Sequence, residues 1–427
     1  MSESGMPLLR PRNRFQRDAE FAKKFADFDR KRGFEGWRLR VEQIADVDHL
    51  RYAYLRLEAE GGAAPGPDGA TYDRLSVNEV FDNLRVLARV LKDGTYRPAL
   101  AREKSIEKST PGQYRTILMR NLMDRVAGKA LQIATRPFWE YRFPRNCYAY
   151  RPRRGIWDMI AAIEVALRRT GRRVLAIGDV KTAFDTVPID RVVHWHRVVL
   201  ARVRLANYPR AERERMAALI EAVLRGDDPN QITGIDQGGC YSPTALNVLL
   251  GYELDRPLKT IPTNPLGFRY SDNIAYLVSS VSDGLHVLEQ VNHLLLPLGM
   301  KLKGEGGGVH DLSTGDAVTL LGLDLQWTNG VLDLKPPVKA WTTLRQNLQE
   351  CYKTPIPSRS ALTVLTGWTS AYAPAVTDSD FGLMLSTAAE YGFREFNSET
   401  ILQAWMKSWE RWRRCRARAS QRFRSTP

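Results

Sequence analysis

The stretch RVLAIGDV (residues 173–180) decides the fold, because it is a short, apolar and β-rich run that carries an acidic residue, Asp179, at its end. A second stretch, FRYSDNIAYLV (residues 268–278), predicts two strands that flank a tight turn around Asp272. Each aspartate alone is typical of a turn or a helix cap. If the strands pair in one sheet, both carboxylates reach the same edge, where they are hard oxygen ligands suited to Mg²⁺.

The residues around these runs predict an α+β fold. The run TALNVLLGYEL (residues 244–254) lies between the two aspartates and has the composition of a largely buried helix. Another helix is expected after the hairpin, with Leu285, Leu288 and Leu295 at helical spacing. Strand, helix, hairpin and helix form an α+β order. After about residue 336 the pattern changes to helices with little strand character.

Length and charge narrow the class of protein. A chain of 427 residues is too long for one ordinary compact core, so two or three packed subdomains are expected. The formal net charge of +15 indicates a polyanionic partner, and nucleic acid is the usual one. The alternative is a basic protein from an arginine-rich proteome, which charge alone does not exclude.

The four cysteines and the lack of long apolar runs indicate a cytoplasmic protein. The cysteines lie far apart without metal-ligand spacing, which is typical of reduced thiols. No uncharged run approaches the length that spans a membrane, and the N-terminus lacks an apolar signal core. A soluble, intracellular protein with no membrane partner is therefore expected.

Both ends of the chain are basic. Residues 1–59 predict a mostly helical extension, in which a stripe of Phe21, Phe25 and Phe28 serves packing or, less commonly, base stacking. The chain closes on WMKSWERWRRCRARASQRFR (residues 405–424), a helix with a tryptophan seam and a cationic remainder. Such density of cations beside aromatic rings favours nucleic-acid contact over a solvated face. The expected contact residues are Arg411, Arg413, Arg414, Arg416 and Arg418.

Ten short blocks along the chain resemble, in the correct order, the conserved blocks of reverse transcriptases of the bacterial group II intron-like lineage. The resemblance runs from about residue 61 to 325, and the order makes chance matching implausible. The blocks are PGPDG (65–69), LKDGTYRP (91–98), IEKSTPGQYRTI (106–117), MDR (123–125), CYAYRP (147–152), GDVKTAFDTVP (178–188), DQGGCYSPTALNVLL (236–250), YSDN (270–273), LPLGMKLK (296–303) and LLGLDL (320–325).

The resemblance implies a right-hand polymerase fold with fingers, a palm that carries an antiparallel sheet, and a helical thumb. After the basic extension, residues 60–178 would form the fingers and the start of the palm. Residues 179–335 would form the palm with the catalytic site, and residues 336–427 the helical thumb and basic tail.

The resemblance also implies metal ligands. Asp179 and Asp272 would bind two Mg²⁺ ions, with Mn²⁺ as a substitute, and the backbone carbonyl of Val180 would be a further ligand. Asn273 departs from the family, because most relatives carry a second aspartate there. An amide is a poorer metal ligand, although its carbonyl still coordinates or accepts hydrogen bonds. We therefore expect an active polymerase with an altered metal site.

Nucleotide contacts follow from the same resemblance. Lys108 and Arg115 would hold the triphosphate, since cations suit that target. Phe184 matches a steric gate that favours deoxynucleotides, although the residue alone reads as part of a core. Lys301 or Lys303 would assist near the leaving phosphate, and of the two we take Lys303. Gln237 and Gly238 would line the nucleotide site, where glycine lets the backbone approach a substrate closely.

The function that these features imply is RNA-directed DNA polymerase activity. The chain is most similar to the compact unknown-group, defence-associated reverse transcriptases (type 2-like), which implies a structured, cognate non-coding RNA as template, dNTPs as substrates, cDNA as product and a role against phage. The alternative is a catalytically weak or inactive RNA-binding protein that helps splicing. Template-independent or protein-primed synthesis is a third interpretation, and the oligomeric state stays open.

Overall fold

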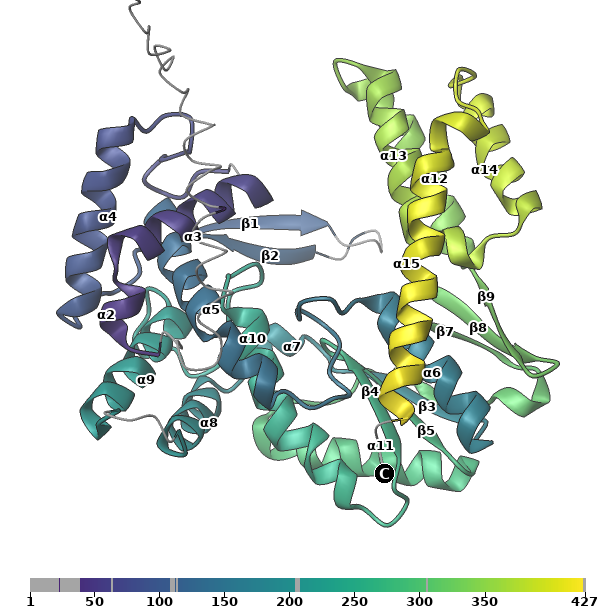
Figure 1. Cartoon of the computed structure of the whole chain (residues 1–427), viewed down its shortest axis with the longest axis horizontal. Helices are drawn as coiled ribbons and strands as arrows, with labels where there is room; N and C mark the ends of the chain where they lie inside the picture. Colours follow the sequence, from purple (N-terminus) through teal and green to yellow (C-terminus); the bar gives the residue numbers. More distant parts are fainter. Residues whose placement is uncertain are drawn as a thin grey trace, which may run out of the picture. The chain divides into compact units, whose positions relative to one another are not determined.

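The computed structural model describes residues 39–424 together with residue 23 (Figure 1), except residues 63, 108–111, 113, 204–207 and 305. The stripe of Phe21, Phe25 and Phe28 therefore lies outside the described residues, as does most of the predicted basic extension. The chain folds as two compact units, each built from separate stretches of sequence.

The first unit consists of Met1–Phe143, Thr182–Tyr252 and Leu298–Met300. It is mainly helical, and its two strands pair antiparallel. Its elements are α2 (Val41–Ile44), α3 (Val47–Glu60), α4 (Val77–Lys92), β1 (Arg102–Glu107), β2 (Tyr114–Met119), α5 (Leu122–Arg142), α7 (Ala183–Thr186), α8 (Ile189–Ala201), α9 (Arg210–Arg225) and α10 (Ser242–Leu250).

The helices of the first unit follow local sequence rules, as α4 illustrates. Ser76 and Glu79 form a capping box, in which each side chain accepts a hydrogen bond from the other residue's backbone N–H. Val80, Leu84 and Leu91 recur at helical spacing and are buried. The cap thus fixes where the helix begins, and the apolar stripe fixes which face packs inward.

The second unit consists of Pro144–Lys181, Glu253–Pro297 and Lys301–Pro427. A π-helical turn, η2 (Gly251–Asp255), leads into it from α10. Its elements are α6 (Ile156–Thr170), β3 (Val174–Asp179), η3 (Pro257–Thr260), β4 (Leu266–Tyr270), β5 (Asn273–Val278), α11 (Val281–Leu295), η4 (Leu296–Leu298), β6 (Gly308–Asp311), η5 (Leu312–Thr314), β7 (Ala317–Leu320), β8 (Leu323–Thr328), β9 (Val331–Lys335), α12 (Val338–Glu350), η6 (Cys351–Lys353), α13 (Pro357–Tyr372), η7 (Ala373–Ala375), α14 (Asp378–Glu390) and α15 (Ser398–Arg424).

A four-stranded antiparallel sheet in the order β4-β5-β3-β6 is the centre of the second unit. Helix α6 packs against β4 and β5, whereas α11 packs against β3, β5 and β6 (Figure 1). Gly284 lets α11 lie close to β6, since a Cβ at this position would meet Val309 Cγ1 at 2.6 Å. The central strand β3 is therefore covered by protein and carries almost only apolar residues.

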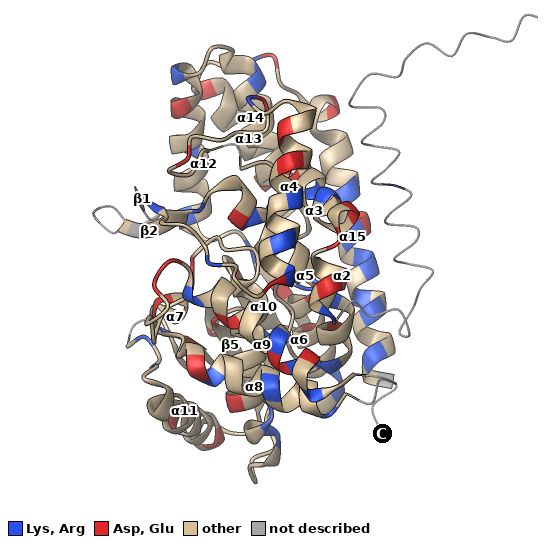
Figure 2. Cartoon of the chain, turned by 90° about the vertical axis from the view of Figure 1, so that its left-hand side faces the viewer, with Lys and Arg blue, Asp and Glu red and all other residues tan. Residues whose placement is uncertain are grey.

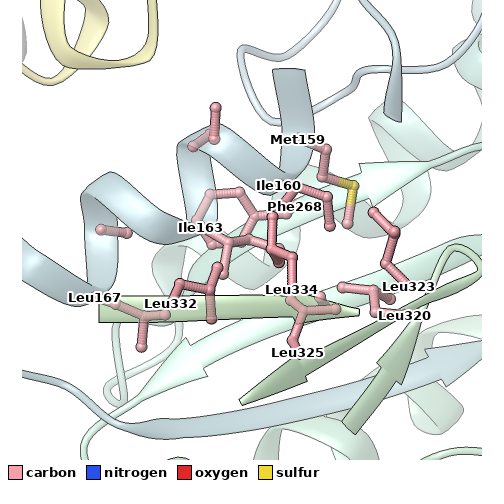
Figure 3. Close-up of a cluster of buried hydrophobic side chains, with 14 of the residues drawn as sticks. Met159, Ile160, Ile163, Leu167, Phe268, Leu320, Leu323, Leu325, Leu332 and Leu334 are labelled. Atoms are coloured by element: carbon pink, nitrogen blue, oxygen red, sulfur yellow. The ribbon is translucent and has the colours of Figure 1, made fainter. Parts of the chain in front are cut away.

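The core of the second unit joins the two sheets to α6. The second sheet, in the order β7-β8-β9, turns its leucines toward the helix (Figure 3). Trp412 and Cys415 of α15 are buried in the same cluster. The side chains at its centre are Met159, Ile160, Ile163, Leu167, Phe268, Leu320, Leu323, Leu325, Leu332 and Leu334.

The structure confirms the α+β class and the expected strands around both aspartates. The helices that were expected after residue 336 are α12–α15, of which α15 packs on α6 and α13. All four cysteines are free thiols. Within the described part of the chain, no helix has the length and apolarity needed to cross a membrane. The division at residues 60, 179 and 336 stays a prediction.

Candidate metal and nucleotide site

The two aspartates meet at one edge of the four-stranded sheet. Asp179 ends β3, and its register partner on β5 is Asn273. Asp272 lies in the turn between β4 and β5, beside that pair, and its carbonyl accepts a hydrogen bond from Val180 N at 3.1 Å. The expected juxtaposition of Asp179 and Asp272 is therefore present, and it follows from strand pairing.

The edge is electrostatically suited to a cation. Burial raises the pKa of the Asp272 carboxyl, and the negative charge of Asp179 raises it further. A carboxylate whose charge is disfavoured by burial and by a neighbouring acid gains from a divalent cation bound beside it. Among the described residues, no group of three His, Cys, Asp or Glu side chains converges. Any metal here would depend on Asp179 and Asp272, with the Val180 carbonyl and the Asn273 amide as the neutral oxygens nearby.

Lys303 supplies a positive charge directly at the site. Its Nζ lies 2.6 Å from Asp179 Oδ1. The backbone holds it there, because Lys303 N donates to Asp179 O and Lys181 N donates to Lys301 O, each at 2.8 Å. A cavity of about 150 Å³ borders Asp179, Asn273 and Lys303. Of the two lysines that were considered, Lys303 is thus the one whose ammonium reaches the carboxylate.

A buried ion pair supports the turn that carries Asp272. The Arg269 guanidinium binds both oxygens of Asp255, at 2.9 and 3.1 Å from Nε and 2.8 Å from Nη2. Its Nη1 also donates to Ser271 O at 3.0 Å. Ser271 adopts a left-handed conformation with φ of +61°, and its hydroxyl donates to the Tyr150 hydroxyl. Arg269 therefore holds the left-handed turn residue Ser271 in place through its backbone carbonyl.

Asn273 faces the same side of the sheet as Asp179, because directly opposed residues in an antiparallel pair share a face. Its Nδ2 lies 3.5 Å from Asp272 Oδ1. The amide of Asn273 therefore lies beside the Asp272 carboxylate and on the same face of the sheet as Asp179, and it adds no charge to the site. An aspartate in place of Asn273 would therefore put a third negative charge next to Asp179 and Asp272.

We expect Asn273→Asp to strengthen Mg²⁺ binding by about tenfold, because affinity in oxygen sites rises with ligand charge. Isothermal calorimetry of the protein without nucleic acid measures this. The matched control is Asn329→Asp, which adds the same charge at the exposed β8–β9 turn. Equal affinity in the two variants would show that position 273 lies outside the metal shell.

Three of the predicted nucleotide residues of the first unit, Phe184, Gln237 and Gly238, lie on α7 and on the loop before α10. Phe184, on α7, is half-buried, and its carbonyl accepts from Ile235 N at 2.9 Å. Gln237 Nε2 donates to Asp185 Oδ1 at 2.9 Å. Gly238 has a φ of +98°, which favours glycine, and a Cβ there would meet Ile117 of β2 at 3.8 Å. The loop thus passes close to β2.

The loop before α10 is anchored by an arginine that the sequence did not indicate. Arg120 is buried and binds Asp236 through Nε at 2.7 Å and Nη2 at 3.0 Å, and it also contacts Asp227. Asp236 directly precedes Gln237, so this pairing sets where the loop starts. Partners 116 residues apart leave no local sequence signal.

The structure describes the two cations expected on the triphosphate only in part. Lys108 lies outside the described residues. Arg115 belongs to β2, where its backbone is paired with Ile106 of β1. Their roles stay predictions.

The arginines of α15 divide into two groups. Arg416 pairs with the buried Glu164 at 2.9 Å, and Arg418 pairs with the buried Asp158 at 2.8 Å, so both attach α15 to α6. Arg411, Arg413 and Arg414 are exposed. Figure 2 shows that basic residues follow one another along α15. Arg414 lies 3.6 Å from Glu410, a weak surface pair.

Comparison with known proteins agrees with the motif order. Residues 106–305, just under half of the chain, match the family described as "Reverse transcriptase (RNA-dependent DNA polymerase)". Protein YkfC of Escherichia coli is 29% identical over 215 residues, which cover 48% of this chain and 53% of YkfC. The group II intron-encoded protein LtrA of Lactococcus lactis is 24% identical over 217 residues, covering 49% of this chain and 33% of LtrA.

The chain therefore spans about half of the first relative and a third of the second. Among solved structures, telomerase from Candida albicans with a fragment of telomeric RNA aligns at TM-score 0.42 and 10% identity, covering 76% of this chain and 64% of that one. Apo telomerase from Candida tropicalis aligns at TM-score 0.44 and 12% identity, covering 73% and 64%. The family match confirms the resemblance to reverse transcriptases over residues 106–305.

Proposed function

We propose that this chain is an RNA-directed DNA polymerase that extends a primer by two-metal nucleotidyl transfer. The observation that carries the proposal is the meeting of Asp179 and Asp272 at one sheet edge, within a stretch that matches the reverse transcriptase family. The raised pKa of the Asp272 carboxyl, caused by burial and by the nearby charge of Asp179, supports a cation at this edge of the sheet.

In this mechanism, Asp179, Asp272 and the Val180 carbonyl would hold two divalent ions, Mg²⁺ or Mn²⁺. When bound, the ions lower the pKa of the primer 3′-hydroxyl and neutralise charge on the leaving pyrophosphate. Lys303 stands beside Asp179 and orients its carboxylate until the nucleotide arrives. Its ammonium then suits the developing charge on the leaving phosphate.

The remaining residues bind and select the nucleotide. Lys108 and Arg115 would neutralise the triphosphate, and Gln237 and Gly238 would bind the nucleotide. Gln237 is held by Asp185, which fixes the amide orientation. Phe184 excludes a ribose 2′-hydroxyl by steric contact.

Replacing Phe184 by Val is expected to raise ribonucleotide use relative to deoxynucleotide use by about tenfold or more, equivalent to roughly 1.4 kcal/mol of discrimination. The ratio of kcat/KM for dGTP and GTP on one primed template measures it. Val keeps an apolar side chain at a half-buried site, so the fold should persist. If the ratio of kcat/KM values for dGTP and GTP does not change, the Phe184 ring serves packing and does not select the sugar.

The narrower proposal is that the template is a dedicated structured non-coding RNA and that the cDNA acts against phage. It is supported by the resemblance of the motif blocks to compact defence-associated enzymes. Sequencing the RNA and cDNA that copurify with the protein from cells, with and without phage, tests it. Reads from one RNA and its complement support the proposal, whereas cDNA from random transcripts contradicts it.

A second candidate is a catalytically weak RNA-binding protein that helps splicing. The neutral Asn273 and the similarity to an intron-encoded protein favour it. One assay separates the two: purified protein, primed RNA, labelled dNTPs and Mg²⁺ or Mn²⁺. Incorporation supports the polymerase. RNA binding without incorporation under either metal supports the splicing helper.

A further inference from the structure

A short loop in the first unit, residues 236–241, carries two of the predicted nucleotide residues, Gln237 and Gly238. We name it the nucleotide loop. Gly239 follows directly, and two consecutive glycines have wide conformational freedom. Residues 237–240 are exposed or half-buried, so their own packing restrains them only weakly. The position of the nucleotide loop therefore depends largely on what holds its two ends.

Buried polar groups of the first unit hold both ends. Asp236, at the start, binds the buried Arg120 at 2.7 and 3.0 Å. Tyr241, at the end, directly precedes α10 and is 1% exposed. Its hydroxyl oxygen lies 3.1 Å from Nε1 of Trp139 on α5 and 2.9 Å from Nε2 of His196 on α8. These two partners are themselves fully buried, at 1% and 0% exposed.

The directions of these hydrogen bonds follow from which atoms can donate. Nδ1 of His196 lies 2.7 Å from Val192 O, and a carbonyl only accepts, so Nδ1 carries the proton. Burial lowers the pKa of His196 to about 4, so the ring is neutral near pH 7 and its Nε2 accepts. Tyr241 therefore donates to His196 and accepts from Trp139. The result is one directed chain from Trp139 through Tyr241 and His196 to Val192.

We propose that Tyr241 is a positioning residue that sets the affinity of the site for the incoming nucleotide. Its side chain is buried, so it acts through the nucleotide loop and does not touch the substrate. The inference rests on the proposed function, because it takes Gln237 and Gly238 as nucleotide ligands. A displaced loop weakens nucleotide binding in the ground state and the transition state alike, which raises KM and leaves kcat nearly unchanged.

The first test replaces Tyr241 by Phe, which keeps the ring and removes the hydroxyl that Trp139 and His196 share. We expect the KM for dGTP on a primed RNA to rise about fivefold, with kcat and the Kd for the primed RNA within about twofold of the wild type. Tyr208→Phe is the matched control in the same unit, since its buried hydroxyl donates to Leu39 O at 2.9 Å. Both variants lose a buried hydrogen bond, but Tyr208→Phe should keep the KM of the wild type.

The second test changes His196, which lies on α8 outside the nucleotide loop. His196→Leu removes the acceptor of the Tyr241 hydroxyl, so the KM for dGTP should rise as in Tyr241→Phe. His196→Gln supplies an amide that both accepts and donates, so the KM should return to within about twofold of the wild type. A general loss of packing would not be repaired selectively by a polar side chain. If Tyr241→Phe does not fold, the comparison of the two His196 variants decides.

The outcomes separate this inference from the proposed function. A wild-type protein that incorporates no nucleotide would overturn both. If the wild type is active, an unchanged KM in Tyr241→Phe, or an equal rise in Tyr208→Phe, overturns the positioning role alone. Equal KM values in His196→Leu and His196→Gln do the same, because the chain of hydrogen bonds would then have no part in nucleotide affinity.

Discussion

Asp272→Asn is expected to lower DNA synthesis on a primed RNA by at least about a thousandfold. In the proposed mechanism the metals would supply several kcal/mol of transition-state stabilisation, and each 1.4 kcal/mol corresponds to about a factor of ten. Asn keeps the shape of the side chain and the turn, so the loss reflects the missing charge at the edge shared with Asp179. Single-nucleotide incorporation under Mg²⁺ measures it, with Asp316→Asn as an exposed control.

Stability provides the check that the variant has not simply unfolded. Because burial and Asp179 raise the pKa of Asp272, the folded state binds this proton more tightly than the unfolded state. Ionisation near neutral pH therefore costs stability, and the cost grows as pH rises above about 4 toward the raised pKa. The Asp272→Asn change removes that cost, because an amide does not ionise. We expect the melting temperature of the variant at pH 7 to equal or exceed that of the wild type, while RNA binding persists.

A lower melting temperature for Asp272→Asn at pH 7 would contradict the electrostatic description. Full DNA synthesis by this variant would contradict a catalytic role for Asp272. The two readouts, melting temperature and DNA synthesis, are independent of each other. If the chain protects cells against phage, as proposed, that protection should disappear together with synthesis. Protection that survives the change would move the function away from catalysis.

The parts of the site that the sequence predicted are those that local patterns encode. The apolar run before Asp179 and the turn around Asp272 have strand and hairpin periodicity, so their pairing followed once a common sheet was assumed. Lys303 required the family resemblance, because a lysine that follows an apolar helix has many possible positions. The backbone pairing with Lys181 and Asp179 gives it one.

The parts that the sequence did not predict are set by tertiary contact. Arg269 and Asp255 are 14 residues apart on different elements, and neither stands out among the chain's charged residues. The five arginines of α15 show the same difficulty. Holding a buried acid such as Glu164 and binding a phosphate both call for a cation, so spacing alone does not separate Arg416 from Arg413.

Asp255→Ala is expected to cost about 3–5 kcal/mol of unfolding free energy, because it leaves the Arg269 guanidinium buried without its counter-ion. Both side chains are almost fully buried, at 1% and 0% exposed, so solvent does not compensate. Urea denaturation of the full chain measures it. Glu350→Ala is the matched control, since its pair with Lys353 is exposed and should contribute under about 1 kcal/mol. Equal losses in the two variants would contradict the prediction.

The double variant Arg269→Met/Asp255→Leu separates stability from positioning. Replacing both charges by apolar groups removes the unpaired charge, so most of the lost stability should return. The hydrogen bond from Arg269 to Ser271 O does not return, and that bond holds the left-handed turn next to Asp272. We therefore expect a stable protein whose synthesis rate stays at least about tenfold low. If both stability and the rate of DNA synthesis recover, the turn keeps its geometry without Arg269. The Arg269–Asp255 ion pair would then contribute to stability only.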